Sequence, residues 1–171
     1  MTERTLSSKP VFTSKNFSVR SDQVRLPHGP VTTMHVIRHP GSVVLLPMPD
    51  PDHIILARQY RYAIDQWTWE LPAGTIHSNE TPEQAAVREC HEEIAKLPQK
   101  LELLKKFFPT PGYSDELMIF FRLTELTDPT HAAETDEDED IKAGLFTLEE
   151  ALLLVANDSP DMKTALGLRL I

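Results

Sequence analysis

The chain has 171 residues, of which 40% are hydrophobic and 25% charged, as is usual for one globular domain with a buried core. Its formal net charge of −9 argues against a protein that binds nucleic-acid phosphates through a basic surface. Its one cysteine excludes an internal disulfide, and no apolar run reaches the roughly 18 residues of a membrane-spanning helix. The polar N-terminus lacks the apolar segment of a secretory signal, so we expect a cytoplasmic protein.

The first third of the chain is rich in predicted strands. Residues 1–10 are polar and are expected to be loose. Short alternating patterns predict strands within residues 11–26, and a longer one predicts a strand at 31–38, after a Pro-His-Gly-Pro turn. The continuous apolar run at 42–47 is typical of a buried strand, and we expect residues 53–59 to be its hairpin partner.

Residues 58–74, RQYRYAIDQWTWELPAG, combine arginine and tryptophan with a proline-containing turn. Arg58 and Arg61 could contact phosphate, because a guanidinium matches it bidentately, and a salt bridge at the edge of the core is an equally good interpretation. Trp67 and Trp69 could offer a face to a nucleobase, although a buried structural role is commoner for tryptophan. The turn after Glu70 would place backbone carbonyls near the next helix.

The following segment predicts a helix with a well-defined start. Thr81 is a good N-cap, Pro82 suits the first helical position, and Gln84 completes a capping box. The apolar residues of this helix fall on one stripe at helical spacing, namely Ala86, Val87, Cys90 and Ile94.

Acidic residues line an adjacent face of the same helix. Glu89 and Glu93 are four residues apart and lie one above the other, with Glu92 close by and Arg88 able to pair with it. Like charges at this spacing destabilise a free helix by roughly 0.2–0.5 kcal/mol per pair, so the arrangement is unfavourable unless a cation binds. Carboxylate oxygens, completed by water and phosphate, are the ligands that Mg²⁺ prefers. The pattern therefore indicates a divalent-metal site.

Several elements follow the helix. Residues 100–108 predict a strand that leads into a loop at 109–116, PTPGYSDE, whose two prolines and glycine could form one wall of a pocket. Residues 117–123 predict a buried strand. Residues 134–140 hold six acids in seven positions, which usually indicates a solvated loop. The chain closes with a predicted strand at 141–146, a helix from Thr147 through Val155–Ala156 and a last helix from Ser159–Pro160.

The spacing of these residues resembles the Nudix box, G-x5-E-x7-R-E-U-x-E-E-x-G-U. The matching positions are Gly74, Glu80, Arg88, Glu89, Cys90, Glu92 and Glu93. Ala95 and Lys96 depart from the box, which has glycine and an aliphatic residue there, and alanine adopts the positive φ of a helix C-cap less readily than glycine. Together with the 58–74 segment and Pro111, fifteen residues beyond Lys96, the box resembles the ADP-ribose and ADP-sugar pyrophosphatase branch of the Nudix hydrolases.

The resemblance implies an α/β protein with the Nudix fold, an α/β/α sandwich around a mixed β-sheet. That domain would comprise residues 41–171, and the β-rich segment 1–40 would form the dimer contact that the family often makes. The implied reaction is hydrolysis of ADP-ribose to AMP and ribose 5-phosphate with Mg²⁺ or Mn²⁺. We expect a homodimer that acts on a small nucleotide sugar and binds neither nucleic acid nor membrane.

The resemblance also implies roles for individual residues. The metal ligands would be the carbonyl of Ala73 and the carboxylates of Glu89, Glu93 and Glu139. Glu137 would be the general base, and Glu92 and Arg88 would belong to the catalytic set. The substrate would contact Arg58, Arg61, Trp67, Glu70, Pro111, Ser114, Asp115 and Glu116.

Two alternatives stay open. The substrate could be another nucleoside diphosphate sugar, such as a GDP-sugar, or the domain could bind a nucleotide sugar as a sensor without cleaving it. The complete set of box glutamates argues against a sensor, and only Ala95 and Lys96 favour one. Scattered histidines argue against a zinc site, and the chain contains neither a P-loop nor a G-x-S-x-G motif.

Overall fold

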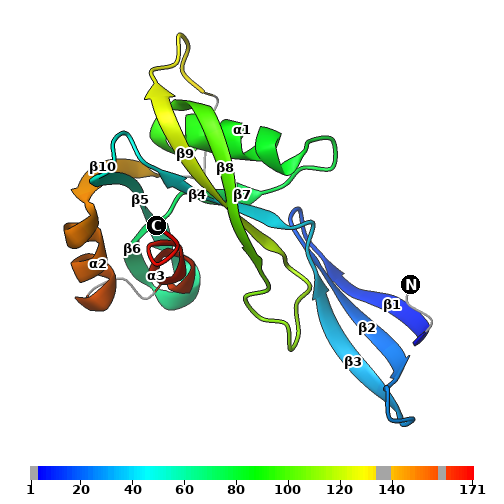
Figure 1. Ribbon diagram of the computed structural model, residues 1–171. Coiled ribbons are helices and arrows are strands. Elements are labelled where there is room, and N and C mark those ends of the chain that lie inside the picture. The colour runs from blue at the N-terminus through cyan, green and yellow to red at the C-terminus, as the bar shows by residue number, and fades with distance from the viewer. Residues whose placement is uncertain (1–3, 134–139, 158–160) are drawn as a thin grey trace. The chain divides into compact units, whose positions relative to one another are not determined.

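The structure, a computed structural model, describes residues 4–133, 140–157 and 161–171. The chain forms two compact units, and Figure 1 shows the elements of each. The first unit consists of Met1–Gly41 and Phe107–Met118, and the second of Ser42–Lys106 and Ile119–Ile171. The PTPGYSDE loop therefore groups with the N-terminal strands, which its sequence did not indicate. The proposed division into residues 1–40 and 41–171 stays a prediction.

The first unit is built on a three-stranded antiparallel sheet in the order β1-β2-β3. Its strands are β1 (Thr5–Thr13), β2 (Ser18–Arg25) and β3 (Val31–Arg38). The expectation of a loose segment over residues 1–10 is wrong for the part that β1 occupies. Polar composition did not predict this strand because its backbone partners, from Val24 to Ser18, come from β2.

The second unit contains two sheets. The four-stranded sheet has the order β7-β4-β9-β8, and the three-stranded sheet has the order β10-β5-β6. A short 3-10 turn, η1 (Tyr62–Ile64), connects β5 to β6. The strands are β4 (Ser42–Pro47), β5 (His53–Arg61), β6 (Gln66–Glu70), β7 (Ala73–Thr75), β8 (Leu97–Phe107), β9 (Met118–Thr127) and β10 (Lys142–Thr147).

The prediction that β4 and β5 form a hairpin is wrong, because the two strands lie in different sheets. The end of β4 turns instead to β9, where the Met48 N–H donates to the Leu123 carbonyl at 2.9 Å. All six residues of β4 are buried, and four consecutive residues of β5 are buried as well. Strands that are apolar on both faces can each occupy the interior of a sheet, so the local pattern does not decide their partners.

In the part of the chain that the structure describes, three α-helices cover these sheets. Helix α1 (Pro82–Ile94) packs against β4 and β7, α2 (Leu148–Asn157) against β10 and β5, and α3 (Met162–Gly167) against β4 and α2. The α/β class expected from the sequence is confirmed. None of the helices in the described residues is both long and apolar enough to cross a membrane. The core includes the fully buried side chains of Val43, Val44, Leu45, Leu46, Ile54, Leu56, Leu71, Phe120 and Leu123.

Candidate active site

The start of helix α1 is fixed by its own sequence. The Gln84 N–H donates to the Thr81 hydroxyl at 3.3 Å, and the Thr81 N–H donates to the Gln84 side chain at 2.8 Å. The predicted capping box, with Pro82 in the first turn, is confirmed. Because the cap sets where the helix begins, it also sets which face the following carboxylates occupy.

Helix α1 buries acidic residues together with its apolar stripe. Cys90 and Ile94 are buried as predicted, but so are Glu89 and Glu93, each only 8% exposed, whereas Val87 is half-buried. Burial, followed by the charge of Glu93, raises the pKa of the Cys90 thiol to about 12, so this cysteine stays protonated. Two carboxylates one turn apart on a buried face require partners or a cation.

Gly74 gives the Glu89 carboxylate its space. A Cβ at Gly74 would lie 1.8 Å from Oε1 of Glu89 and 2.0 Å from its carboxyl carbon. Only glycine lets the chain of β7 pass this close to a side chain of α1. Gly74, the first position of the box, therefore leaves the space that Glu89, the first of the predicted metal-ligating carboxylates, occupies.

Arg88 donates all five of its guanidinium N–H groups. Nε and Nη2 donate to Glu80 at 3.1 and 2.6 Å, and Nη2 also donates to the Thr75 carbonyl at 3.0 Å. Nη1 donates to Glu89 at 2.7 Å and to Glu92 at 2.8 Å, the pairing that the helix spacing predicts. These partners, Glu80 foremost, raise the pKa of Arg88 above its usual value. Such a saturated guanidinium orients the carboxylates around it.

Ala73, whose carbonyl is a predicted metal ligand, lies beside helix α1. The Ala73 N–H donates to Oε2 of Glu93 at 3.3 Å, so β7 and α1 are in contact at this point. In the described residues, no three histidine, cysteine or acidic side chains are already arranged around one metal position. The donors that meet here are nevertheless hard oxygens with excess negative charge, which is the chemistry that Mg²⁺ and Mn²⁺ prefer.

A second charged group surrounds Glu70, at the end of β6. Arg61 donates to both oxygens of its carboxylate, at 2.8 and 2.6 Å, and Thr68 and Lys163 also donate to it. Burial by itself would raise the pKa of Glu70, but Arg61, Lys163 and Thr68 lower it to about 2. Arg61 thus makes the salt bridge that the sequence left as one of two interpretations. Substrate contacts of Arg61 and Glu70 stay predictions.

The two tryptophans of β6 have different surroundings. Trp69 packs against Phe146 with ring centroids 4.9 Å apart, which is a structural contact. Trp67 is 44% exposed and lies 5.7 Å from the Tyr60 ring, and the Arg58 guanidinium stands 5.0 Å from its centroid. A partly exposed aromatic ring with a guanidinium over it suits a ligand that has both a base and a phosphate.

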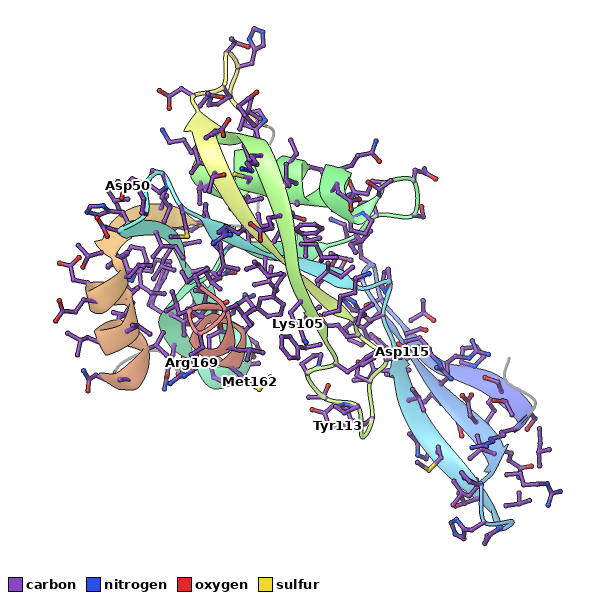
Figure 2. All side chains as sticks on the ribbon, viewed as in Figure 1. Asp50, Lys105, Tyr113, Asp115, Met162 and Arg169 are labelled. Atoms are coloured by element: carbon purple, nitrogen blue, oxygen red, sulfur yellow. The ribbon has the colours of Figure 1, made fainter. Side chains whose placement is uncertain are left out.

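The PTPGYSDE loop is held by β3 within the first unit, and Figure 2 labels Tyr113 and Asp115 on it. The Asp115 carboxylate accepts from Arg38 and from the His39 N–H, each at 2.9 Å, and the Glu116 N–H donates to Ser114 Oγ at 3.2 Å. Substrate contacts of the loop residues, including Pro111, stay predictions. The predicted base Glu137 and metal ligand Glu139 lie outside the described residues.

The sequence did not indicate a role for Lys163 and Thr164, two residues of α3 that bond to Glu70 and Leu71. Both are buried, although lysine on a short terminal helix is usually solvated. Their partners, Glu70 and Leu71, lie 93 residues earlier in the chain. Only Glu70 could have indicated such a partner, because an acidic residue among buried strand residues requires a cation from elsewhere in the fold.

Comparison with known proteins agrees with the geometry. An ADP-ribose pyrophosphatase of Bacillus subtilis is 33% identical over 168 residues, which are 98% of this chain and 91% of that protein. One of Mycobacterium tuberculosis is 33% identical over 148 residues, 86% of this chain and 72% of that protein. A solved structure of an ADP compounds hydrolase superposes with a TM-score of 0.82 at 23% identity, covering 97% of this chain and 90% of that one.

That superposition shows a shared fold, in agreement with the α/β/α expectation. Residues 38–166 match the NUDIX domain family, and this range contains every part of the box from Gly74 to Glu93. The chain therefore belongs to the NUDIX family.

Proposed function

We propose that this protein hydrolyses the pyrophosphate bond of ADP-ribose, or of a related ADP-sugar, to AMP and a sugar phosphate. One observation carries the proposal: Glu89 and Glu93 are buried one helical turn apart, and Gly74 leaves the space that the Glu89 carboxylate occupies. The similarity over 98% of the chain to an ADP-ribose pyrophosphatase supports this choice of substrate.

The carboxylates of Glu89 and Glu93 and the carbonyl of Ala73 would hold Mg²⁺ or Mn²⁺, with Glu139 as a further ligand. A bound divalent cation neutralises phosphate charge and polarises the phosphoryl oxygens. Arg88 keeps Glu89 and Glu92 oriented through its bonds to both. Glu92 would stay close to the cation without leaving its guanidinium partner.

The exposed ring of Trp67 would stack on the adenine, and Arg58 above it would reach a phosphate oxygen. Glu137 would accept the proton of a water molecule that attacks one phosphorus. The new bond joins that oxygen to the phosphorus, and the bridging oxygen leaves with the second phosphate. The products are AMP and ribose 5-phosphate.

The direct test is hydrolysis of a panel of nucleotide sugars in Mg²⁺ by the wild type and by Glu93→Gln, followed by chromatography of the products. We expect ADP-ribose to be cleaved only with metal, and kcat to fall at least about 100-fold in the variant. Glu83→Gln is the matched control, because Glu83 is an exposed glutamate in the first turn of the same helix. Full activity in Glu93→Gln would refute the proposal.

The same panel separates the alternatives. Preference for a GDP-sugar would keep the chemistry and change the substrate. If no compound is cleaved while a nucleotide sugar raises the melting temperature, the protein is a sensor. Glu137→Gln then tests the base, since this change should lower kcat without weakening metal binding.

We also propose that the N-terminal sheet forms the contact of a homodimer. Apolar side chains stand exposed on this sheet, namely Leu6, Val11, Phe12, Val31 and Met34, and Phe17 is exposed in the turn between β1 and β2. Light scattering should give twice the chain mass for the wild type and the single chain mass for Phe12→Lys. A monomeric wild type would refute this contact. Location in the cytoplasm stays a prediction.

A further inference from the structure

The short helix α3 bonds to the segment that leads into the candidate metal site. Lys163 is 7% exposed and Thr164 is fully buried. The Lys163 ammonium donates to the Glu70 carboxylate, and the Leu71 N–H donates to Thr164 Oγ1 at 2.7 Å. Two neighbouring residues of α3 thus hold two neighbouring residues at the end of β6.

Helix α3 is itself held firmly at this place. Asp161, its N-cap, accepts from the Thr164 N–H and from Lys163 Nζ, each at 3.0 Å. A Cβ at Gly167 would lie 2.3 Å from Cδ1 of Leu71, so the helix packs as closely on Leu71 as glycine allows. Figure 2 labels Met162 on this helix and Arg169 just after it.

The other end of the same segment is held by β4 and α1. The Leu45 N–H donates to the Pro72 carbonyl at 2.8 Å, and the Ala73 N–H donates to Glu93 at 3.3 Å. Gly74 then packs against the Glu89 carboxylate. Residues 70–74 are therefore fixed at both ends. Pro72, whose ring confines φ, connects the part held by α3 to Ala73.

We propose that Lys163 and Thr164 are positioning residues for the divalent-cation site. They hold residues 70–74 so that the Ala73 carbonyl stays in register with the carboxylates of α1. Lys163 donates to Glu70 and Asp161, and it would act on the cation site through Glu70. The inference rests on the proposed function for its reaction, but cation binding is measured without any substrate.

The test compares Lys163→Met with Arg169→Met, which removes an exposed cation beside the same helix whose guanidinium donates to the Ala165 carbonyl. The probe is Mn²⁺ alone, with the free ion followed by electron paramagnetic resonance. We expect Lys163→Met to weaken Mn²⁺ binding about 10–100-fold, the range for residues that orient metal ligands, with Arg169→Met unchanged. The KM for ADP-ribose at saturating metal should stay within about threefold, and Lys163→Arg should restore part of the affinity.

A folded Lys163→Met variant with wild-type Mn²⁺ affinity would overturn the inference. If this variant does not fold, Thr164→Val serves instead, because it removes the acceptor of the Leu71 N–H and leaves every charge in place. Its Mn²⁺ affinity should fall about tenfold, and an unchanged value would overturn the inference. A wild type that binds Mn²⁺ but cleaves no nucleotide sugar refutes the proposed function alone.

Discussion

The two charged groups of the second unit differ in their balance of charge. Around Arg88 lies an acidic group in which three carboxylates of the box, Glu80, Glu89 and Glu92, share one guanidinium, while Glu93 is buried one helical turn from Glu89. Around Glu70, two carboxylates, Glu70 and Asp161, meet two cations, Arg61 and Lys163. A balanced buried group needs no further ion, and losing one partner destabilises the fold, whereas a group with surplus negative charge is complete only when a cation joins it. By their balance of charge, we therefore assign the group around Glu70 to the scaffold and the acidic group around Arg88 to the candidate site.

The largest expected effect comes from Gly74→Ala, which acts on the acidic group alone. The added Cβ must displace the Glu89 carboxylate, the far end of a flexible side chain, so the fold should survive. We expect kcat to fall about 100-fold or more, with a melting temperature within a few degrees of wild type. Glu83→Gln is again the control, because Glu83 is exposed in the first turn of α1. Equal activity in both variants would show that Glu89 is not needed in this position.

Arg88→Met removes the guanidinium that pairs with Glu80, Glu89 and Glu92 in the acidic group. Three carboxylates and the Thr75 carbonyl lose their donor, so we expect a loss of about 3 kcal/mol in the free energy of unfolding, measured in urea. The control is Arg122→Met, which breaks the exposed ion pair to Glu102 and should change stability by less than about 1 kcal/mol. Similar values for both variants would contradict an organising role for Arg88.

The balanced group around Glu70 should make the stability of the protein depend on pH. The pKa of Glu70 is about 2 in the folded protein, below its ordinary value of 4.5. Its contribution is therefore fully present above pH 4.5 and disappears as the pH falls from about 4.5 to 2, by up to about 3 kcal/mol. Urea unfolding followed from neutral pH down to about pH 2.5 should show this loss, and Glu70→Gln should flatten it. An equally steep profile in the variant would assign the loss to other carboxylates.

Removing a carboxylate from the acidic group should change stability in the direction opposite to the loss of the Glu70 charge. In metal-free buffer with EDTA, Glu93→Gln relieves repulsion from Glu89, so we expect stability to be unchanged or higher by up to about 1 kcal/mol. Thermal unfolding with and without Mg²⁺ measures this, and the metal should raise the melting temperature of the wild type only. A strong destabilisation in EDTA would mean that Glu93, like Glu70, belongs to the scaffold.

The smallest effect is expected at the end of α1. Ala95 has φ of 51° and ψ of 45°, the left-handed conformation that the family's glycine adopts easily, and Lys96 beside it pairs with Asp128. Ala95→Gly should therefore raise stability by about 0.5 kcal/mol and leave kcat unchanged. A change in kcat would show that the departure from the box reaches the metal site.

Predictions from the sequence succeeded where the determining contacts are local. The capping box, the pairing of Arg88 with Glu92 and the burial of Cys90 and Ile94 all follow from spacings of one helical turn. The hairpin of β4 and β5 failed, because two strands that are apolar on both faces carry no information about their neighbours. Trp67 and Trp69 look alike in the sequence, and only packing distinguishes the exposed ring from the buried contact.

By itself, the sequence determined the helix of the box and the order of its carboxylates, because capping and the 3.6-residue repeat act within a few residues. The tertiary structure decided that Glu89 fits against Gly74, that Asp115 is held by Arg38 and that Lys163 neutralises Glu70. Those partners stand between 15 and 93 positions apart, and only the packing of sheets and helices brings them together. Local electrostatics can identify an unbalanced set of acids, but the fold decides which of them are buried and which are neutralised.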